Sequence, residues 1–124
     1  MNIENLTIAE CRQIAAMFGG QTAVPPCPHI GKRVIIRGYA SGVHYGTLSA
    51  HHERQVTLTE SRRMWRWHAK GGITLSEVAL NGLGSGEVRL QVVLPEITIL
   101  DAVEIIPCSK AACASIDSAP VYVP

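Results

Sequence analysis

The chain has 124 residues, of which 47% are hydrophobic and 17% are charged, values typical of one globular domain and not of a disordered segment. Its formal net charge of +1 argues against binding to duplex nucleic acid, which usually requires a strong basic excess. No apolar run approaches the roughly 20 residues that span a bilayer, and the sequence does not open with a basic and then apolar leader. We therefore expect an intracellular protein with no membrane partner.

The first 31 residues are predicted to form a helix and a linker. In residues 5–19, Thr7 and Glu10 stand at the spacing of a capping box, and an apolar stripe with helical spacing follows: Cys11, Ile14, Ala15 and Phe18. Three prolines in residues 21–31 favour an extended linker. Because this stripe and an apolar tail exceed what one small core can cover, we expect a homo-oligomer.

The next region is predicted to hold three strands in meander order. The expected strands are residues 32–40, residues 43–48 and residues 54–60, and the third continues through residues 61–68. Gly46, inside the second strand, indicates a bulge or a close approach of two backbones.

A helix is predicted after these strands. Thr74 and Glu77 stand at the spacing of a second capping box, and the helix is expected to run through Asn81. Its core-facing residues are expected to be Leu75, Val78 and Ala79.

The remaining sequence predicts more strands and a final helix. Residues 87–94 alternate as a strand that Pro95 is expected to end. The apolar residues 97–106, interrupted by Asp101, are interpreted as one bent strand buried on both faces. Ser109 is expected to cap a last helix, residues 110–116.

Together these elements predict one α+β domain with a bent antiparallel sheet or small β-barrel of five to seven strands and short helices at its edges. We expect three segments: an N-terminal helix and linker (1–31), a β-rich core (32–116) and an extended tail (117–124).

Arginines and tryptophans alternate along the predicted third strand. The candidate ligand-binding residues there are Arg62, Arg63, Trp65, Arg66 and Trp67. With a period of two, Arg63, Trp65 and Trp67 should share one face. Indoles stack on bases and guanidinium groups pair with phosphates, so a ligand surface is one interpretation. The other is structural, with the tryptophans in the core and the arginine stems covering them.

His44 and Tyr45 are further candidates for ligand binding, because Gly42 and Gly46 beside them allow a ligand or backbone to approach closely. A histidine on a strand is more often a hydrogen-bonded structural residue. His51, His52 and Glu53 are adjacent, so their side chains diverge and form a poor metal site.

The cysteines and the known catalytic motifs do not predict a reaction. Cys11, Cys27, Cys108 and Cys113 form no C-x-x-C pair and are interpreted as reduced thiols, although Cys108 follows Pro107 and precedes a predicted helix, where a thiolate is favoured. No P-loop, G-x-S-x-G or H-E-x-x-H motif is present, so we predict no catalytic residue, no metal and no cofactor.

Four motifs carry a resemblance to a known family: GVHYG, RRMWRW, LSEVAL and EIIPC, in this order within about residues 33–116. The chain resembles a family of small proteins of tailed bacteriophages and prophages that carry a domain of unknown function. The resemblance implies a phage origin and a host-cytoplasm setting but no reaction. The segment before Lys32 is not part of the pattern.

Three hypotheses for function follow. The first is a non-enzymatic phage protein that binds and sequesters a small phosphorylated ligand, such as a nucleotide immune signal of the host, and so counteracts defence. The second is a structural or interaction protein of the phage, either a virion accessory or an inhibitor of a host protein. The third, an enzyme that uses Cys108 or His44, lacks a supporting motif.

Overall fold

The structure is a computed structural model that describes residues 27–124. The predicted helix over residues 5–19 and the linker up to residue 26 lie outside the described residues. No helix in the described range has the length and the apolar character needed to cross a membrane.

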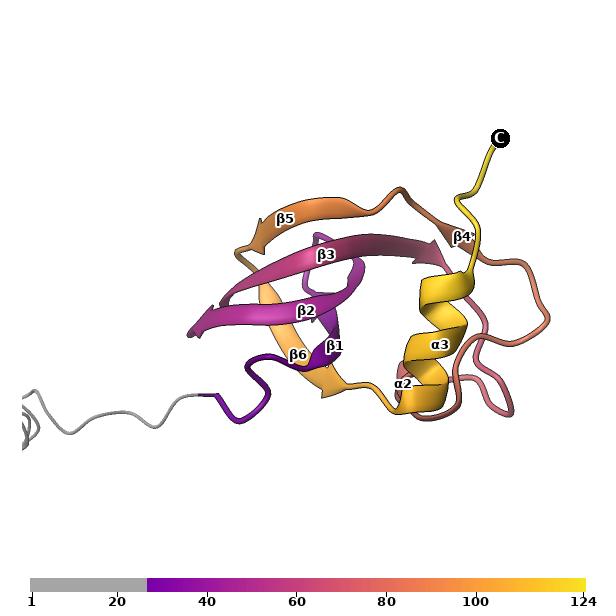
Figure 1. Cartoon of the computed structure of the whole chain (residues 1–124), viewed down its shortest axis with the longest axis horizontal. Helices are drawn as coiled ribbons and strands as arrows, with labels where there is room; N and C mark the ends of the chain where they lie inside the picture. Colours follow the sequence, from indigo (N-terminus) through magenta and orange to yellow (C-terminus); the bar gives the residue numbers. More distant parts are fainter. Residues whose placement is uncertain (1–26) are drawn as a thin grey trace, which may run out of the picture.

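The described chain folds into six strands and two helices, which are β1 (Arg33–Gly38), β2 (Val43–His52), β3 (Gln55–Arg66), α2 (Leu75–Asn81), β4 (Arg89–Leu90), β5 (Leu94–Ile99), β6 (Ala102–Pro107) and α3 (Lys110–Ser118). The sheet is antiparallel, with the order β4-β3-β2-β1-β6, and β5 pairs with the first half of β3 (Figure 1). It is bent but does not close into a barrel, which confirms the α+β class predicted from the sequence.

Both faces of the sheet are buried, and β1 shows why. Val34 and Ile36 pack into a cluster built from strand residues only, the sheet cluster, while Ile35 between them packs into a second cluster beneath the helices, the helix cluster. The sheet cluster contains Val34, Ile36, Leu48, Val56, Leu58, Ile99 and Ala102. The helix cluster contains Ile35, Tyr45, Met64, Leu75, Val78, Ala79, Leu90 and Ile116.

The two helices begin where their caps predict. Thr74 Oγ1 accepts from the Glu77 N–H, the Glu77 carboxylate accepts from the Thr74 N–H at 2.8 Å, and Gly82 follows the helix. Ser109 caps α3 by accepting from the Ala112 N–H at 3.0 Å. Local sequence signals therefore suffice to define these helix starts.

Pairing over long sequence distances corrects the prediction for the second half of the sheet. Residues 97–106 form not one bent strand but two, β5 and β6, joined by Leu100 and Asp101. The strands pair at different places, β5 with β3 and β6 with β1, and β5 is mostly exposed rather than buried on both faces. Pro95 lies inside β5 instead of ending a strand, which an edge strand tolerates. Of the predicted strand over residues 87–94, Arg89–Leu90 pair with the end of β3 as β4, and Leu94 is already the first residue of β5.

The end of β3 departs from simple alternation. A register irregularity lies between Met64 and Arg66, where β3 pairs with β4. Trp67, beyond the end of β3, packs against the helix cluster to which Met64 belongs, whereas Trp65 is half exposed. The prediction that the two tryptophans share one face was therefore wrong, because the irregularity changes the phase of the side chains.

Candidate functional site

A small pocket lies beside the middle of β3, and His44 and Arg63 line it together. The two residues are cross-strand partners on β2 and β3, so their side chains lie on one face of the sheet. The other lining residues come from β3, from the segment between β4 and β5, and from β5: Ser61, Gln91, Val92, Leu94 and Ile97. The cavity has a volume of about 100 Å³.

His44 is fully buried and is held from behind by the turn between β1 and β2. Its Nε2 lies 3.2 Å from the Ser41 carbonyl oxygen and 3.4 Å from Ser41 Oγ. Burial, together with the positive charge of Arg63, lowers the pKa of His44 below its ordinary value. We therefore treat the ring as neutral near pH 7, with Nδ1 buried and lacking a hydrogen-bond partner.

Asp101, in the connection between β5 and β6, fixes the turn that holds His44. Its carboxylate accepts from Ser41 Oγ at 2.6 Å and from the N–H groups of Ala40 and Ser41 at 2.7 and 2.9 Å. These hydrogen bonds, with that of the Ser41 hydroxyl the largest contribution, lower the pKa of Asp101. Asp101, Ser41 and His44 thus form one hydrogen-bonded chain that ends at the pocket.

Arg63 supplies the positive charge of the pocket. Its side chain is exposed, and it takes part in none of the ion pairs within residues 27–124. An exposed guanidinium without a carboxylate partner retains its five N–H donors for an external anion.

Tyr45 and Arg62 lie on the opposite face of the sheet and do not reach this pocket. Tyr45 is buried in the helix cluster, where its hydroxyl accepts from Arg33 Nε at 3.1 Å, and burial raises its pKa far above the ordinary value. Arg62 is 3% exposed and donates to the backbone oxygens of Gln91, Ile116 and Ala119. Both side chains serve the fold.

Trp65 and Arg66 form a separate surface with the C-terminal tail. The Arg89 guanidinium lies over the rings of Trp65 and Tyr122, at 4.9 and 4.6 Å from their centroids. Trp65 is 50% exposed and meets Tyr122 edge to face, with 6.0 Å between the centroids. Arg66 and Arg89 both pair with Glu87, at 3.1 and 2.7 Å. Of the seven predicted ligand-binding residues, the pocket therefore brings together only His44 and Arg63.

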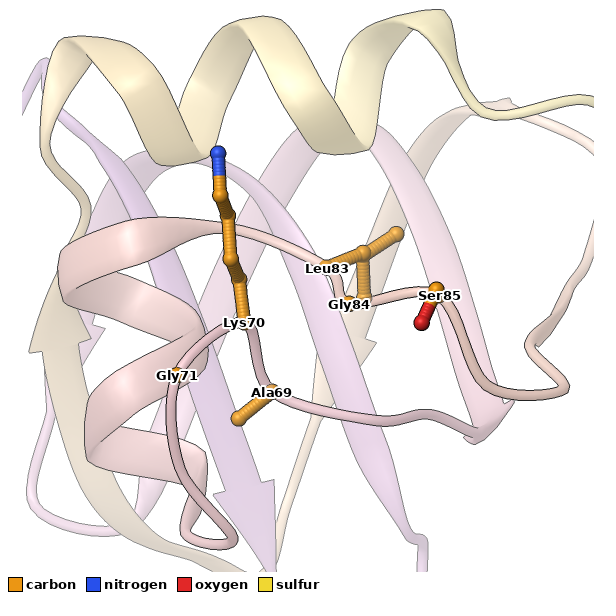
Figure 2. Close-up of a pocket in the computed structure, with 6 residues that line it drawn as sticks. All are labelled: Ala69, Lys70, Gly71, Leu83, Gly84 and Ser85. Atoms are coloured by element: carbon orange, nitrogen blue, oxygen red, sulfur yellow. The ribbon is translucent and has the colours of Figure 1, made fainter.

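A larger cavity of about 490 Å³ lies between residues 69–71 and residues 83–85. Figure 2 shows that the Lys70 side chain extends toward α3, whereas the Ser85 hydroxyl points away from α3. The polar groups of this cavity do not converge on one point, so it is a weaker candidate than the pocket of His44 and Arg63.

Cys108 does not have the environment of a reactive thiol. Although it precedes Ser109, the cap of α3, burial and the neighbouring Cys113 raise the pKa of its thiol to about 12. The expectation of a favoured thiolate at this position was wrong, because desolvation outweighs the helix terminus. In the described part of the chain, no group of three His, Cys, Asp or Glu side chains is placed to hold a metal ion.

Sequence reasoning missed most of the pocket. Ser61 and Gln91 were not candidates, because they gain their position only from the pairing of β3 with its neighbours. Asp101 did carry a signal, since an acidic residue that interrupts an apolar run needs a partner. Ser41, next to Gly42, indicates by sequence only a turn.

Comparisons with known proteins give a family without a function. No curated protein matches the chain, and no solved structure matches it. One family model, described as "Domain of unknown function (DUF6948)", matches residues 31–116. These residues make up more than half of the chain and include every residue that lines the pocket of His44 and Arg63. The chain therefore belongs to the family of proteins that contain this domain.

Proposed function

We propose that the protein binds the anionic group of a small phosphorylated ligand, such as a nucleotide, in the pocket of His44 and Arg63, and sequesters it without chemical change. One observation carries the proposal: a buried histidine with an unpartnered Nδ1 and an arginine outside all the described ion pairs line the same small pocket. Arginine is well suited to this role, because its planar fork pairs with phosphate through two parallel hydrogen bonds.

The size of the pocket limits what can enter it. A volume of about 100 Å³ is far below the roughly 300 Å³ or more of a pocket that holds a drug-sized ligand. Only the anionic group would be enclosed. The rest of the ligand would lie on the rim, where Val92 and Leu94 are 58% and 42% exposed.

The resemblance to phage proteins supplies the setting of this proposal. A small phage protein that binds a nucleotide can lower the free concentration of a host signal by mass action, provided that the protein is abundant. We therefore propose a nucleotide immune signal of the host as the ligand to test first, with the homo-oligomer remaining a prediction.

Calorimetric titration with linear and cyclic nucleotides tests the proposed function. The Arg63→Ala variant should lose at least tenfold in affinity, because a charge-assisted hydrogen bond is worth about 1.5–3 kcal/mol. Arg54→Ala is the matched control: it removes the same charge from an exposed position about 30 Å away along β3 and should bind as the wild type does. Absence of binding to the whole panel, or equal affinities of the two variants, would remove the proposal.

A second candidate function is recognition of a host or phage protein. It is favoured by three consecutive exposed apolar side chains beside the pocket, Val92, Val93 and Leu94, because exposed apolar patches mark interaction sites. Affinity capture from infected cells tests it. A stoichiometric partner that Val93→Asp releases and Arg63→Ala retains would favour this function over nucleotide binding.

A further inference from the structure

The position of the proton on His44 follows from its partners. Nε2 faces the Ser41 carbonyl oxygen, which can only accept, and Ser41 Oγ, whose own hydrogen is directed to Asp101 at 2.6 Å. Because both neighbours offer lone pairs, the hydrogen of the neutral ring resides on Nε2. Nδ1 therefore carries a lone pair and is a hydrogen-bond acceptor.

Two residues that line the pocket therefore have unused hydrogen-bonding groups: His44 has an acceptor and Arg63 has a set of donors. Nδ1 of His44 is buried and without a partner, and burying an acceptor unpaired is unfavourable. Arg63, on the neighbouring strand, supplies donors and a positive charge. An anion with lone pairs on every oxygen would satisfy Arg63 and would be repelled by Nδ1. An anion that also carries an O–H would satisfy both residues.

We propose that the ligand group in this pocket is a phosphomonoester or hydrogen phosphate, bound with a hydrogen on one oxygen that it donates to His44 Nδ1, and not a phosphodiester or a sulfate. This inference rests on the proposed function and names its ligand class. A phosphomonoester has its second pKa near 6 and can carry such a hydrogen around neutral pH, whereas a phosphodiester and sulfate have none to donate. Nucleotides with a terminal phosphate should therefore bind better than cyclic nucleotides.

The charged groups around His44 set how this selectivity responds to pH. Arg63 on β3 disfavours protonation of the ring, and Asp101, acting from the β5–β6 connection, favours it. Once His44 gains a proton, Nδ1 becomes a donor and the reason to reject sulfate disappears. Selectivity for phosphate over sulfate should therefore shrink as the pH falls.

The experiment is an NMR titration of the full chain with inorganic phosphate and with sulfate, at equal ionic strength and pH 7. Phosphate should bind about tenfold more tightly or better, because sulfate leaves the acceptor unpaired. His44→Asn should reduce the difference to less than about threefold, since a side-chain amide offers both a donor and an acceptor. The ¹⁵N shifts of the His44 ring in the wild type should show the hydrogen on Nε2, a result that does not depend on whether the variant folds.

The outcomes separate the inference from the proposed function. Arg63-dependent binding of both anions with equal affinity, or a hydrogen on Nδ1 in the wild type, overturns the inference and leaves the anion pocket standing. A pocket that binds neither anion nor any nucleotide overturns the proposed function itself. Tighter binding of a cyclic nucleotide than of its linear monophosphate also contradicts the inference.

Discussion

Arg62 Nη1 donates a hydrogen bond of 2.6 Å to the carbonyl oxygen of Ala119, the C-cap residue that follows α3. The same nitrogen donates to the Ile116 carbonyl at 2.9 Å, and Nε donates to that of Gln91 at 3.0 Å. A cation at the last carbonyls of a helix satisfies groups that would otherwise be orphaned and interacts favourably with the helix dipole. Arg62 therefore fastens β3 to α3 and to the segment that precedes β5.

We predict that Arg62→Ala lowers the free energy of unfolding by about 2–4 kcal/mol, because it removes three hydrogen bonds to backbone carbonyl groups and opens a cavity. Arg62→Lys should recover only part of this loss, since one ammonium cannot reproduce the fork. Urea unfolding measures the effect. The neighbouring variant Arg63→Ala should change stability by less than about 0.5 kcal/mol. Equal losses in the two alanine variants would contradict the structural role assigned to Arg62 and not to Arg63.

We predict that His44 makes the fold less stable as the pH drops below about 6.5, its unfolded pKa. Because the folded pKa is lowered, the unfolded chain binds a proton there that the folded chain does not, so acid favours unfolding until the folded pKa is passed. The slope cannot exceed about 1.4 kcal/mol per pH unit for one proton. Unfolding followed between pH 5 and pH 7.5 should show a shallower slope in His44→Asn than in the wild type. The same slope in His44→Asn as in the wild type would contradict this prediction.

We predict that Gly46→Ala destabilises the fold by about 1–3 kcal/mol through overpacking. A Cβ atom at this position would lie 3.0 Å from the Thr59 carbonyl oxygen and 3.1 Å from the Cα of Ser61. Because Ser61 lines the pocket, its backbone amide signal should also shift in the NMR spectrum. In the comparison variant Gly42→Ala, the new Cβ meets no atom within 4 Å, but the alanine residue has to adopt a backbone φ of +93°. It should cost stability and leave Ser61 unmoved; a shift of Ser61 in both variants would contradict the packing argument.

We predict that Cys108 reacts with iodoacetamide at pH 8 at least about a hundredfold more slowly in the folded protein than in urea, where its thiol pKa returns to about 8.5. The folded-state pKa of about 12 leaves almost no thiolate. Peptide mass spectrometry after timed alkylation measures the reaction at this residue. Fast modification of the folded chain would revive the hypothesis of a nucleophilic enzyme.

The parts of the fold that sequence predicted are those that local chemistry decides. Thr74 and Ser109 cap helices through hydrogen bonds to residues three positions away, so the pattern contains all the partners. Gly46 was identified as a site of close approach because a strand interior disfavours glycine.

What sequence could not predict depends on partners distant along the chain. Alternation along β3 puts Arg62 and Arg63 on opposite faces of the sheet, but only the packing of α3 against one face decides which of them is buried. Asp101 accepts a hydrogen bond from Ser41, in a turn 60 residues earlier, and the sequence of neither segment indicates this contact. The one apolar run divided into two strands because β5 and β6 have different neighbours, a choice made by the whole sheet.

The contact between Asp101 and Ser41 also has a consequence for synthesis of the protein. His44 is made early, yet the carboxylate that fixes its turn, and the pairing of β6 with β1, become available only when most of the domain has been translated. Contacts between residues so far apart form late and slowly. In a growing polypeptide, the turn beside His44 therefore stays without its anchoring carboxylate until the connection between β5 and β6 has been made.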